Sequence, residues 1–168
     1  MAPAPRHVDS PAVSLRNGVA GDVPGIIDLI HRENGRPADA DRIRRRLAQM
    51  PSVVAETDSG IVAFIYCRRF SPDLVELSNM VVDSTLRRRG LGGRMVDSLE
   101  PQLQAAGFRG AIFVNCRLHV GTSDQRSAAA RAFWLRRGYR IVFATHGSAV
   151  FSKAFGPAAP AHGGATAD

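Results

Sequence analysis

The feature that most restricts the fold of this chain is a glycine-rich turn between a strand pattern and a helix pattern. Residues 87–93 read RRRGLGG. A strand candidate at residues 74–82 precedes them, and Leu91, Met95 and Leu99 follow at helical spacing. A strand that turns directly into a helix offers free backbone N–H groups and the positive end of the helix dipole to an anion. The turn therefore predicts a mixed α/β domain with a phosphate site at one strand end.

The composition of the turn fits such a site. Gly90 and Gly92 would let the backbone approach a ligand closely, and the flanking arginines would add positive charge. Two other phosphate loops are excluded, because no Lys-Ser or Lys-Thr pair follows the glycines and their spacing is not Gly-x-Gly-x-x-Gly. A plain strand-to-helix turn with solvated arginines stays the alternative.

Hydrophobic periodicity and turn residues predict the other elements. In order, they are a strand at residues 12–16, a helix from Gly21-Asp22 to Asn34-Gly35, a helix from about Asp39 or Asp41 to Pro51, a hairpin of residues 53–56 and 61–69, a strand at 74–82, a helix from the glycine turn to Gly107, a strand at 111–115, a helix at about 127–137, and strands at 139–144 and 149–155. Pro101 is expected to kink the helix that contains it or to unsettle one turn.

Length and composition bound the domain organisation. A chain of 168 residues with 45% hydrophobic content can bury one core, so we expect one domain at residues 12–156 between disordered tails at 1–11 and 157–168. Cys67 and Cys116 stand far apart in apolar runs, which indicates reduced thiols and neither a disulfide nor a metal site. No signal peptide or membrane-spanning stretch is recognisable, so we expect a cytoplasmic protein.

The charge favours acidic partners without choosing among them. Lys and Arg number 22 against 15 Asp and Glu, a formal net charge of +7. A polyphosphate cofactor, an acidic substrate or nucleic acid would each fit this balance. We interpret the clusters at residues 44–46 and 136–137 as solvated helix faces.

The motif Arg87-x-x-Gly90-x-Gly92 resembles the signature of the GNAT superfamily of N-acyltransferases. The resemblance extends over residues 12–155, because the predicted order of elements is also that of the superfamily, including the late pair Gly138-Tyr139. It implies an α/β (α+β) fold with a mixed, mostly antiparallel twisted sheet of six to seven strands and about four helices. Residues 74–82 and 111–115 would be the central parallel strands, splayed to hold coenzyme A (CoA).

The resemblance also implies acetyl-CoA as the acyl-donor substrate and no metal. The pantetheine arm would pair with backbone groups of Met80 and Val82, and the amides of residues 88–94 would hold the pyrophosphate. The donor-binding residues that it implies are Met80, Val82, Arg87, Arg88, Arg89, Gly90, Leu91, Gly92, Gly93, Arg94, Ser127 and Trp134.

Glu76 is the candidate general base, since it coincides in position with the catalytic glutamate of the histone-acetylating branch. Alternatively, its carboxylate faces solvent or pairs with Arg68 or Arg69. Trp134 stands where the family usually has the tyrosine that protonates the leaving thiolate, and an indole cannot supply that proton. Ser127 stands where many members have an asparagine that touches pantetheine.

Three further residues carry alternatives. His119 and His146 could serve as bases, although single loop histidines are more often merely exposed. Cys116 has a thioester-exchange interpretation, but it lacks a base beside it in sequence and fits a buried apolar position better.

These residues predict an N-acetyltransferase that transfers acetyl from acetyl-CoA to an amine of a small molecule or protein in a ternary complex. The alternatives are a non-catalytic acyl-CoA-binding regulatory module and an acetyltransferase acting on aminoacyl-tRNA. The expected partners are acyl-CoA and the amine acceptor, with no membrane. Nucleic acid is less favoured, because no aromatic-rich basic strand is present, and a homodimer is left open. Residues 26–50 and 144–149, expected on the acceptor side, carry no interpretable motif.

Overall fold

The structure is a computed structural model that describes residues 12–115, 124–145 and 148–156. Several predictions from the sequence fall outside these residues. They are the two disordered tails at 1–11 and 157–168 and the alternative chemistry of Cys116, His119 and His146.

Seven strands and four α-helices occupy the described residues. The strands are β1 (Ser14–Asn17), β2 (Ser52–Thr57), β3 (Gly60–Arg69), β4 (Leu74–Val82), β5 (Gly110–Asn115), β6 (Arg140–Ala144) and β7 (Ala149–Ala154). The α-helices are α1 (Val23–Asn34), α2 (Ala40–Gln49), α3 (Leu91–Ala105) and α4 (Asp124–Arg136), and two short 3₁₀ helices are η1 (Ala20–Asp22) and η2 (Ser84–Leu86).

The strands form one mixed sheet in the order β1-β2-β3-β4-β5-β7-β6. The pairing of β4 with β5 is parallel, whereas β1 with β2, β2 with β3, β5 with β7 and β6 with β7 are antiparallel. The predicted fold class is therefore confirmed. None of the described helices has the length and apolar character needed to cross a membrane.

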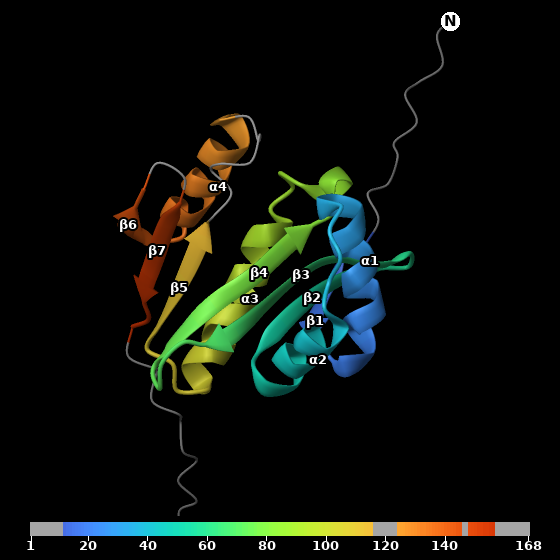
Figure 1. Ribbon diagram of the computed structural model, residues 1–168, viewed down its shortest axis with the longest axis horizontal. Helices are drawn as coiled ribbons and strands as arrows, with labels where there is room; N and C mark the ends of the chain where they lie inside the picture. Colours follow the sequence, from blue (N-terminus) through green and yellow to red (C-terminus); the bar gives the residue numbers. More distant parts are fainter. Residues whose placement is uncertain (1–11, 116–123, 146–147, 157–168) are drawn as a thin grey trace, which may run out of the picture. The chain divides into compact units, whose positions relative to one another are not determined.

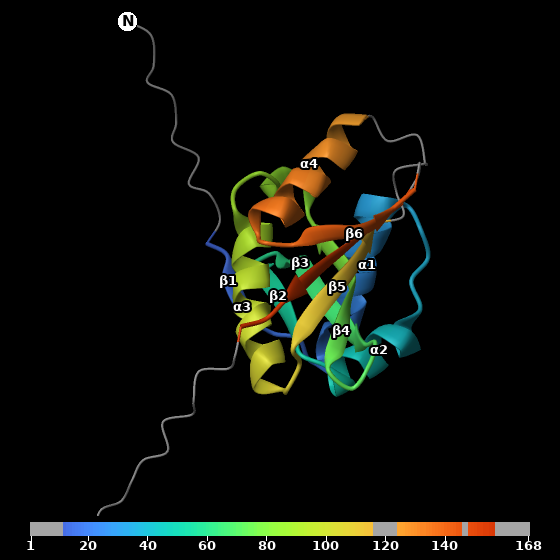
Figure 2. The same ribbon diagram turned by 90° about the vertical axis from the view of Figure 1, so that its left-hand side faces the viewer.

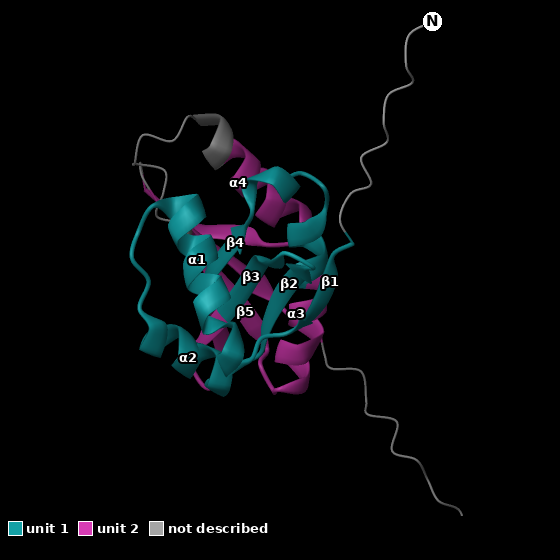
Figure 3. Ribbon diagram, turned by 90° about the vertical axis from the view of Figure 1, so that its right-hand side faces the viewer, with its two compact units in different colours: residues 1–66, 79–96 teal, residues 67–78, 97–168 magenta. Residues whose placement is uncertain are grey.

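Two compact units share the chain, and both are interrupted in sequence. Unit 1 comprises residues 1–66 and 79–96, and unit 2 comprises residues 67–78 and 97–168 (Figure 3). The boundaries fall inside β3, β4 and α3, so each of these elements contributes one part to each unit.

The core of unit 1 lies between its two N-terminal helices and one face of its strands (Figure 1). Ile26 and Leu29 of α1 and Ile43 of α2 are buried in one cluster with Phe64 and Val81 of the sheet. On β2 and β3 the intervening residues point to the other face, because side chains alternate along a strand, and they are fully buried as well. These strands are covered on both faces.

Helix α2 explains the arginine cluster at residues 44–46. Asp39 caps the helix by accepting a hydrogen bond from the backbone N–H of Arg42 at 2.9 Å. Ile43 and Leu47 are buried, whereas Arg44 and Arg45 are exposed. The cluster is thus largely the solvent face of an amphipathic helix, as predicted.

Unit 2 contains an aromatic cluster whose residues come from α4, β5, β7 and the segment between α4 and β6. Figure 2 shows how these elements follow one another in the ribbon. The ring of Trp134 on α4 lies 4.4 Å from that of Phe113 on β5 and 4.9 Å from that of Tyr139, which follows the helix. Phe151 on β7 continues the cluster at 6.3 Å from Phe113. Aromatic pairs at these separations stabilise beyond the area that they bury.

Strand β4 carries an irregularity that positions the candidate site. The Asp83 N–H donates to Val62 O, and the Phe70 N–H donates to Leu74 O. Between these two hydrogen bonds β4 has one more residue than β3, which indicates a β-bulge. The register of β4 with β5 ends at Glu76 and Ile112, although both strands continue through described residues. A bulge bends its strand locally and interrupts the regular pairing.

Some element boundaries differ from the predictions. Strand β1 lies two residues later than predicted at its start, α4 begins at Asp124 and not near residue 127, and α3 continues through Pro101 without interruption. Gly35 and Gly107 end α1 and α3 with φ angles of 61° and 89°, as expected for glycines at helix C-termini.

Candidate functional site

The glycine-rich turn adopts a left-handed backbone at two positions. Arg88 has φ 62° and Gly90 has φ 79°. Helix α3 begins directly afterwards at Leu91, and the Arg94 N–H closes its first turn by donating to Gly90 O at 3.1 Å. Alternating backbone handedness before a helix gathers N–H groups into a concave anion site, and the N–H groups of the first helical turn have no partner within the helix. The backbone of residues 88–94 therefore suits a phosphate group.

The last residues of strand β4 lead into this turn, and their backbone groups point alternately toward β3 and away from it. The Asp83 N–H points toward β3, because it donates to Val62 O at 2.8 Å. Backbone groups of neighbouring residues point to opposite edges of a strand, so those of Val82 and Met80 face away from β3. The pairing of the pantetheine arm with Met80 and Val82 stays a prediction, and Val82 O already accepts a hydrogen bond from Arg87 Nε at 2.9 Å.

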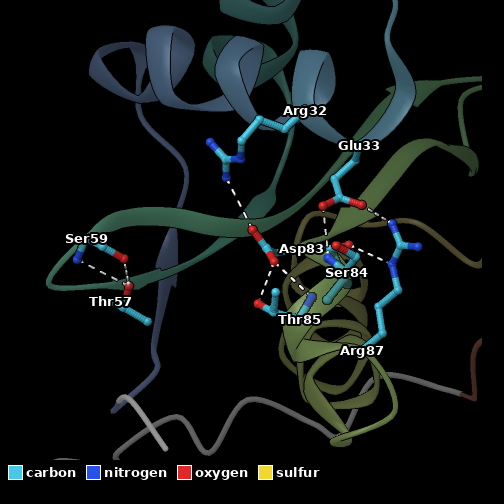
Figure 4. A network of polar contacts seen from close by, with 9 residues as sticks. Arg32, Glu33, Thr57, Ser59, Asp83, Ser84, Thr85 and Arg87 are labelled. Carbon is cyan, nitrogen blue, oxygen red and sulfur yellow. Dashed lines mark hydrogen bonds and ion pairs between the residues drawn. The ribbon is translucent and has the colours of Figure 1, made fainter.

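The side chain of Arg87 is engaged within the protein. Its Nε donates to Val82 O at 2.9 Å, and its terminal nitrogen pairs with Glu33 Oε2 on α1 (Figure 4). Arg88 is exposed, as are Arg89 and Arg94. Of the four arginines predicted to bind the donor, Arg87 is thus oriented by α1 and by the end of β4.

Glu76 on β4 forms an ion pair with Arg68 on β3. Arg68 Nε donates to Glu76 Oε2 at 2.8 Å, and a terminal nitrogen of the same guanidinium reaches the same oxygen. The Glu76 side chain is 14% exposed and that of Arg68 is 45% exposed. The sequence left open whether Glu76 pairs with an arginine, and it does. The pair orients the carboxylate and places a positive charge beside it.

Trp134 is a core residue of unit 2. It is 3% exposed, and its ring contacts those of Phe113, Phe133 and Tyr139. Packing therefore accounts for a large aromatic residue at this position.

Ser127 lies in the first part of α4. Its donor contact and that of Trp134 stay predictions.

The two tyrosines of the chain are both hydrogen-bonded. Tyr139 Oη donates to Glu100 Oε1 at 3.1 Å, and Lys153 Nζ donates to Glu100 Oε2 at 2.5 Å. Burial, followed by the charge of Glu100, raises the pKa of Tyr139 above its usual range. Tyr66 Oη on β3 accepts from Asn79 Nδ2 at 3.4 Å. Tyr139 is therefore a poorer proton donor than a free tyrosine.

Sequence reasoning missed two polar groups in unit 1. Glu33 on α1 contacts the β4–α3 connection, and Tyr66 pairs with Asn79 beside the core cluster of α1 and α2. Glu33 is 54 residues from Arg87 in the chain, so no local spacing links them. The only available signal was an acidic residue at the C-terminal end of a helix, which the helix dipole disfavours.

The units divide the predicted site residues. Met80, Val82 and residues 87–94 belong to unit 1, whereas Glu76, Ser127 and Trp134 belong to unit 2. Cys67, also in unit 2, is a buried free thiol whose pKa is raised by burial to about 12, so it is no nucleophile near neutral pH. Among the described residues, no cluster of His, Cys, Asp or Glu could hold a metal ion.

Comparison with solved structures finds the same fold in several acetyltransferases. The ribosomal-protein-S18-alanine N-acetyltransferase from Escherichia coli matches with a TM-score of 0.68 and 18% identity, over 85% of this chain and 94% of that one. The PaiA N-acetyltransferase from Thermoplasma acidophilum, solved with coenzyme A, gives 0.68 and 11% over 86% and 99%. A phosphinothricin acetyltransferase from Sinorhizobium meliloti, solved with acetyl-CoA, gives 0.63 and 22% over 86% and 89%.

Comparison with curated protein sequences finds no match. A sequence model of the acetyltransferase (GNAT) domain, in contrast, matches residues 50–141, which include β4, the glycine-rich turn and α3. Together with the fold, this match identifies the chain as a member of the GNAT acetyltransferase family.

Proposed function

We propose that the protein is an N-acetyltransferase that transfers the acetyl group of acetyl-CoA to an amine of a small molecule or protein. The turn between β4 and α3 carries this proposal. Its left-handed Arg88 and Gly90 gather backbone N–H groups at the start of a helix of 15 residues. The preceding strand offers the backbone of Met80 and the N–H of Val82, which suits the amide groups of a pantetheine arm.

Acetyl-CoA is a fitting donor because its groups match the order of these residues along the chain. Its pyrophosphate is an anion, which the amides of residues 88–94 and the exposed Arg88, Arg89 and Arg94 would bind. Structures of two similar proteins contain coenzyme A or acetyl-CoA, which supports the same donor here.

Glu76 is the proposed general base. The attacking amine must lose a proton as its nitrogen bonds to the thioester carbonyl carbon and the carbon–sulfur bond breaks. Both hydrogen bonds from Arg68 end on Oε2, so Oε1 would accept that proton, directly or through a water molecule. Arg68 would hold the carboxylate in position during the transfer.

No tyrosine takes the thiolate-protonating role at position 134. The indole of Trp134 is not an acid near neutral pH, and Tyr139 is committed to Glu100. We therefore propose that the CoA thiolate receives its proton from solvent.

The proposed acceptor is an amine of a small molecule or of a protein. The names of similar proteins include a ribosomal-protein alanine and phosphinothricin as acceptors, so this fold serves both proteins and small molecules.

A cytoplasmic location belongs to the same proposal, since the buried Cys67 is unpaired.

A non-catalytic acyl-CoA-binding module is the second candidate, and Trp134 favours it. One assay separates the two: the protein is incubated with acetyl-CoA and a panel of amines and peptides, and free thiol is measured. Amine-dependent thiol release is expected. Binding of acetyl-CoA without thiol release for any acceptor would support the second candidate, and no binding of acetyl-CoA would contradict both.

A further inference from the structure

We propose that Glu33 on α1 is a positioning residue for the glycine-rich turn between β4 and α3, and that it acts through Arg87. This inference rests on the proposed use of that turn for acetyl-CoA. The Glu33 carboxylate bridges two points of the β4–α3 connection (Figure 4). Its Oε1 accepts from the Ser84 N–H at 2.9 Å, and its Oε2 pairs with the Arg87 guanidinium.

This contact is partly buried, so breaking it costs more free energy than breaking a surface ion pair. The Glu33 side chain is only 8% exposed, whereas that of Arg87 is 40% exposed. A buried carboxylate requires partners for its charge, and Arg87 and the Ser84 N–H supply them. The interaction is therefore not an ordinary surface ion pair, which would contribute little.

Arg87 carries the constraint from α1 to the end of β4. While its terminal nitrogen meets Glu33, its Nε donates to Val82 O at 2.9 Å. The guanidinium of Arg87, the first residue of the signature motif, thus links helix α1 to the last residue of β4. Nε and one terminal nitrogen of this side chain therefore serve contacts within the protein.

A second contact from the neighbouring residue holds the other end of the connection. Arg32 donates to Asp83 Oδ2 at 3.4 Å, and Asp83 Oδ1 accepts from the N–H of Thr85 at 3.0 Å and from its hydroxyl at 2.7 Å (Figure 4). Two consecutive residues of α1 with opposite charges, Arg32 and Glu33, therefore pair with Asp83 and Arg87 respectively. The backbone between them leads directly into residues 88–94.

The consequence concerns donor affinity. A site made of backbone N–H groups binds an anion well only when those groups are already oriented, because ordering them on binding costs free energy. By holding residues 83–87, Glu33 keeps the following turn in its binding geometry. Helix α1 thereby contributes to CoA affinity without touching the ligand.

Glu33→Gln separates this role from a direct role of Arg87. The amide keeps the shape of the side chain but loses the charge that holds Arg87. If Glu33 positions the turn, the affinity for CoA measured by calorimetry falls about tenfold, the scale of one charge-assisted hydrogen bond. If Arg87 instead binds the pyrophosphate directly, releasing it from Glu33 leaves the affinity unchanged or raises it, which would overturn the proposal.

Arg87→Gln and the double variant add a second criterion. If the two residues act as one unit, each single variant weakens CoA binding and the double variant is no weaker than the worse single one. If the loss of CoA affinity in the double variant equals the product of the two single losses, the residues act independently and the proposal is contradicted. Asp28→Asn is the matched control, because Asp28 is an exposed acid on the same helix and its removal should leave CoA affinity within twofold.

Amide hydrogen exchange gives a readout that needs no CoA. In Glu33→Gln the amide of Ser84 and those of the following residues should exchange faster, while the amides of α1 and β2 keep their protection. Unchanged exchange at Ser84 together with unchanged CoA affinity would refute the positioning role alone. Failure of the wild-type protein to bind CoA would instead refute the proposed function on which it rests.

Discussion

At the scale of single residues, the ion pair between Glu76 and Arg68 bears most of the proposed chemistry. Both side chains come from one antiparallel hairpin, and the carboxylate is 14% exposed. A carboxylate held in one orientation can accept a proton repeatedly at the same point, which general base catalysis requires. Removing this ion pair also removes a structural contact between β3 and β4, so activity is to be measured separately from stability.

Glu76→Gln should lower kcat/KM for the amine by about 100-fold, because an amide cannot accept the proton, while KM for acetyl-CoA changes little. Steady-state kinetics with the best acceptor would test this. The matched control is Asp73→Asn, since Asp73 is an exposed carboxylate at the turn of the same hairpin. Wild-type kcat in Glu76→Gln would show that the base lies elsewhere.

Trp134 should prove to be a packing residue. Trp134→Phe retains an aromatic ring against Phe113 and Tyr139, so kcat should stay within about threefold of wild type. Trp134→Ala removes the ring and should cost about 3–5 kcal/mol in the free energy of unfolding, measured by urea denaturation. A large loss of kcat in a stably folded Trp134→Phe variant would assign a direct role to the indole N–H.

The candidate site could be predicted from sequence only where its residues are neighbours in the chain. The motif from Arg87 to Gly92 and the position of Glu76 relative to it are local spacings, and they were readable. The contact of Glu33 with Arg87 arises from tertiary packing of α1 on β4 and leaves no periodic trace. The sequence shows that Trp134 departs from the family's tyrosine, but not that its ring packs against Phe113 on β5 and against Tyr139 between α4 and β6.

At the scale of elements, the β4–α3 turn depends on the freedom of Gly90. Its φ of 79° disfavours any residue with a Cβ, although a Cβ there would meet no other atom within 4 Å. Backbone geometry therefore favours glycine at this position, and the open space beside it is where a ligand would approach.

Gly90→Ala should raise KM for acetyl-CoA at least tenfold, because the methyl group and the altered φ both disturb the backbone cradle. Gly107→Ala is the control. Gly107 has φ 89° with equally open surroundings at the end of α3, so it should incur a similar strain of about 1 kcal/mol without affecting KM. Equal effects of both variants on KM would contradict the assigned role of the turn.

Elements with strong periodicity were predicted best. Strand β4 has the predicted bounds, and α1 ends at the predicted Asn34-Gly35. The start of α4 was predicted too late, because its first residues lack an apolar stripe. The bulge in β4 was not predictable, since it depends on the register with β3 and not on any residue type in the strand.

At the scale of the whole molecule, buried charge links stability to pH. Arg16 on β1 forms a fork with Asp22, at 2.8 and 2.7 Å, and also pairs with Glu56 on β2. Asp22 Oδ2 accepts from the Val19 N–H as well. The hydrogen bonds from Arg16 are the main cause that lowers the pKa of Asp22 below its usual range.

Because the folded state lowers this pKa, the contribution of Asp22 is complete above the pKa of an unfolded Asp, about 3.9, and is lost as the pH falls further. Asp22→Asn should therefore destabilise the protein by about 2 kcal/mol at pH 7, and the difference from wild type should shrink below about pH 4. Urea unfolding across pH 7 to 3 measures this. A difference that stays constant with pH would exclude the ion pair as its origin.

We propose that the backbone of the β4–α3 turn holds acetyl-CoA. Titrating the isotope-labelled protein with acetyl-CoA while recording amide ¹H–¹⁵N spectra tests it most directly. We expect the largest shifts on residues 88–94 and on Met80 and Val82, and we expect these shifts to saturate as the concentration of acetyl-CoA rises. Saturable binding that leaves these amides unmoved, or no binding at all, would contradict it.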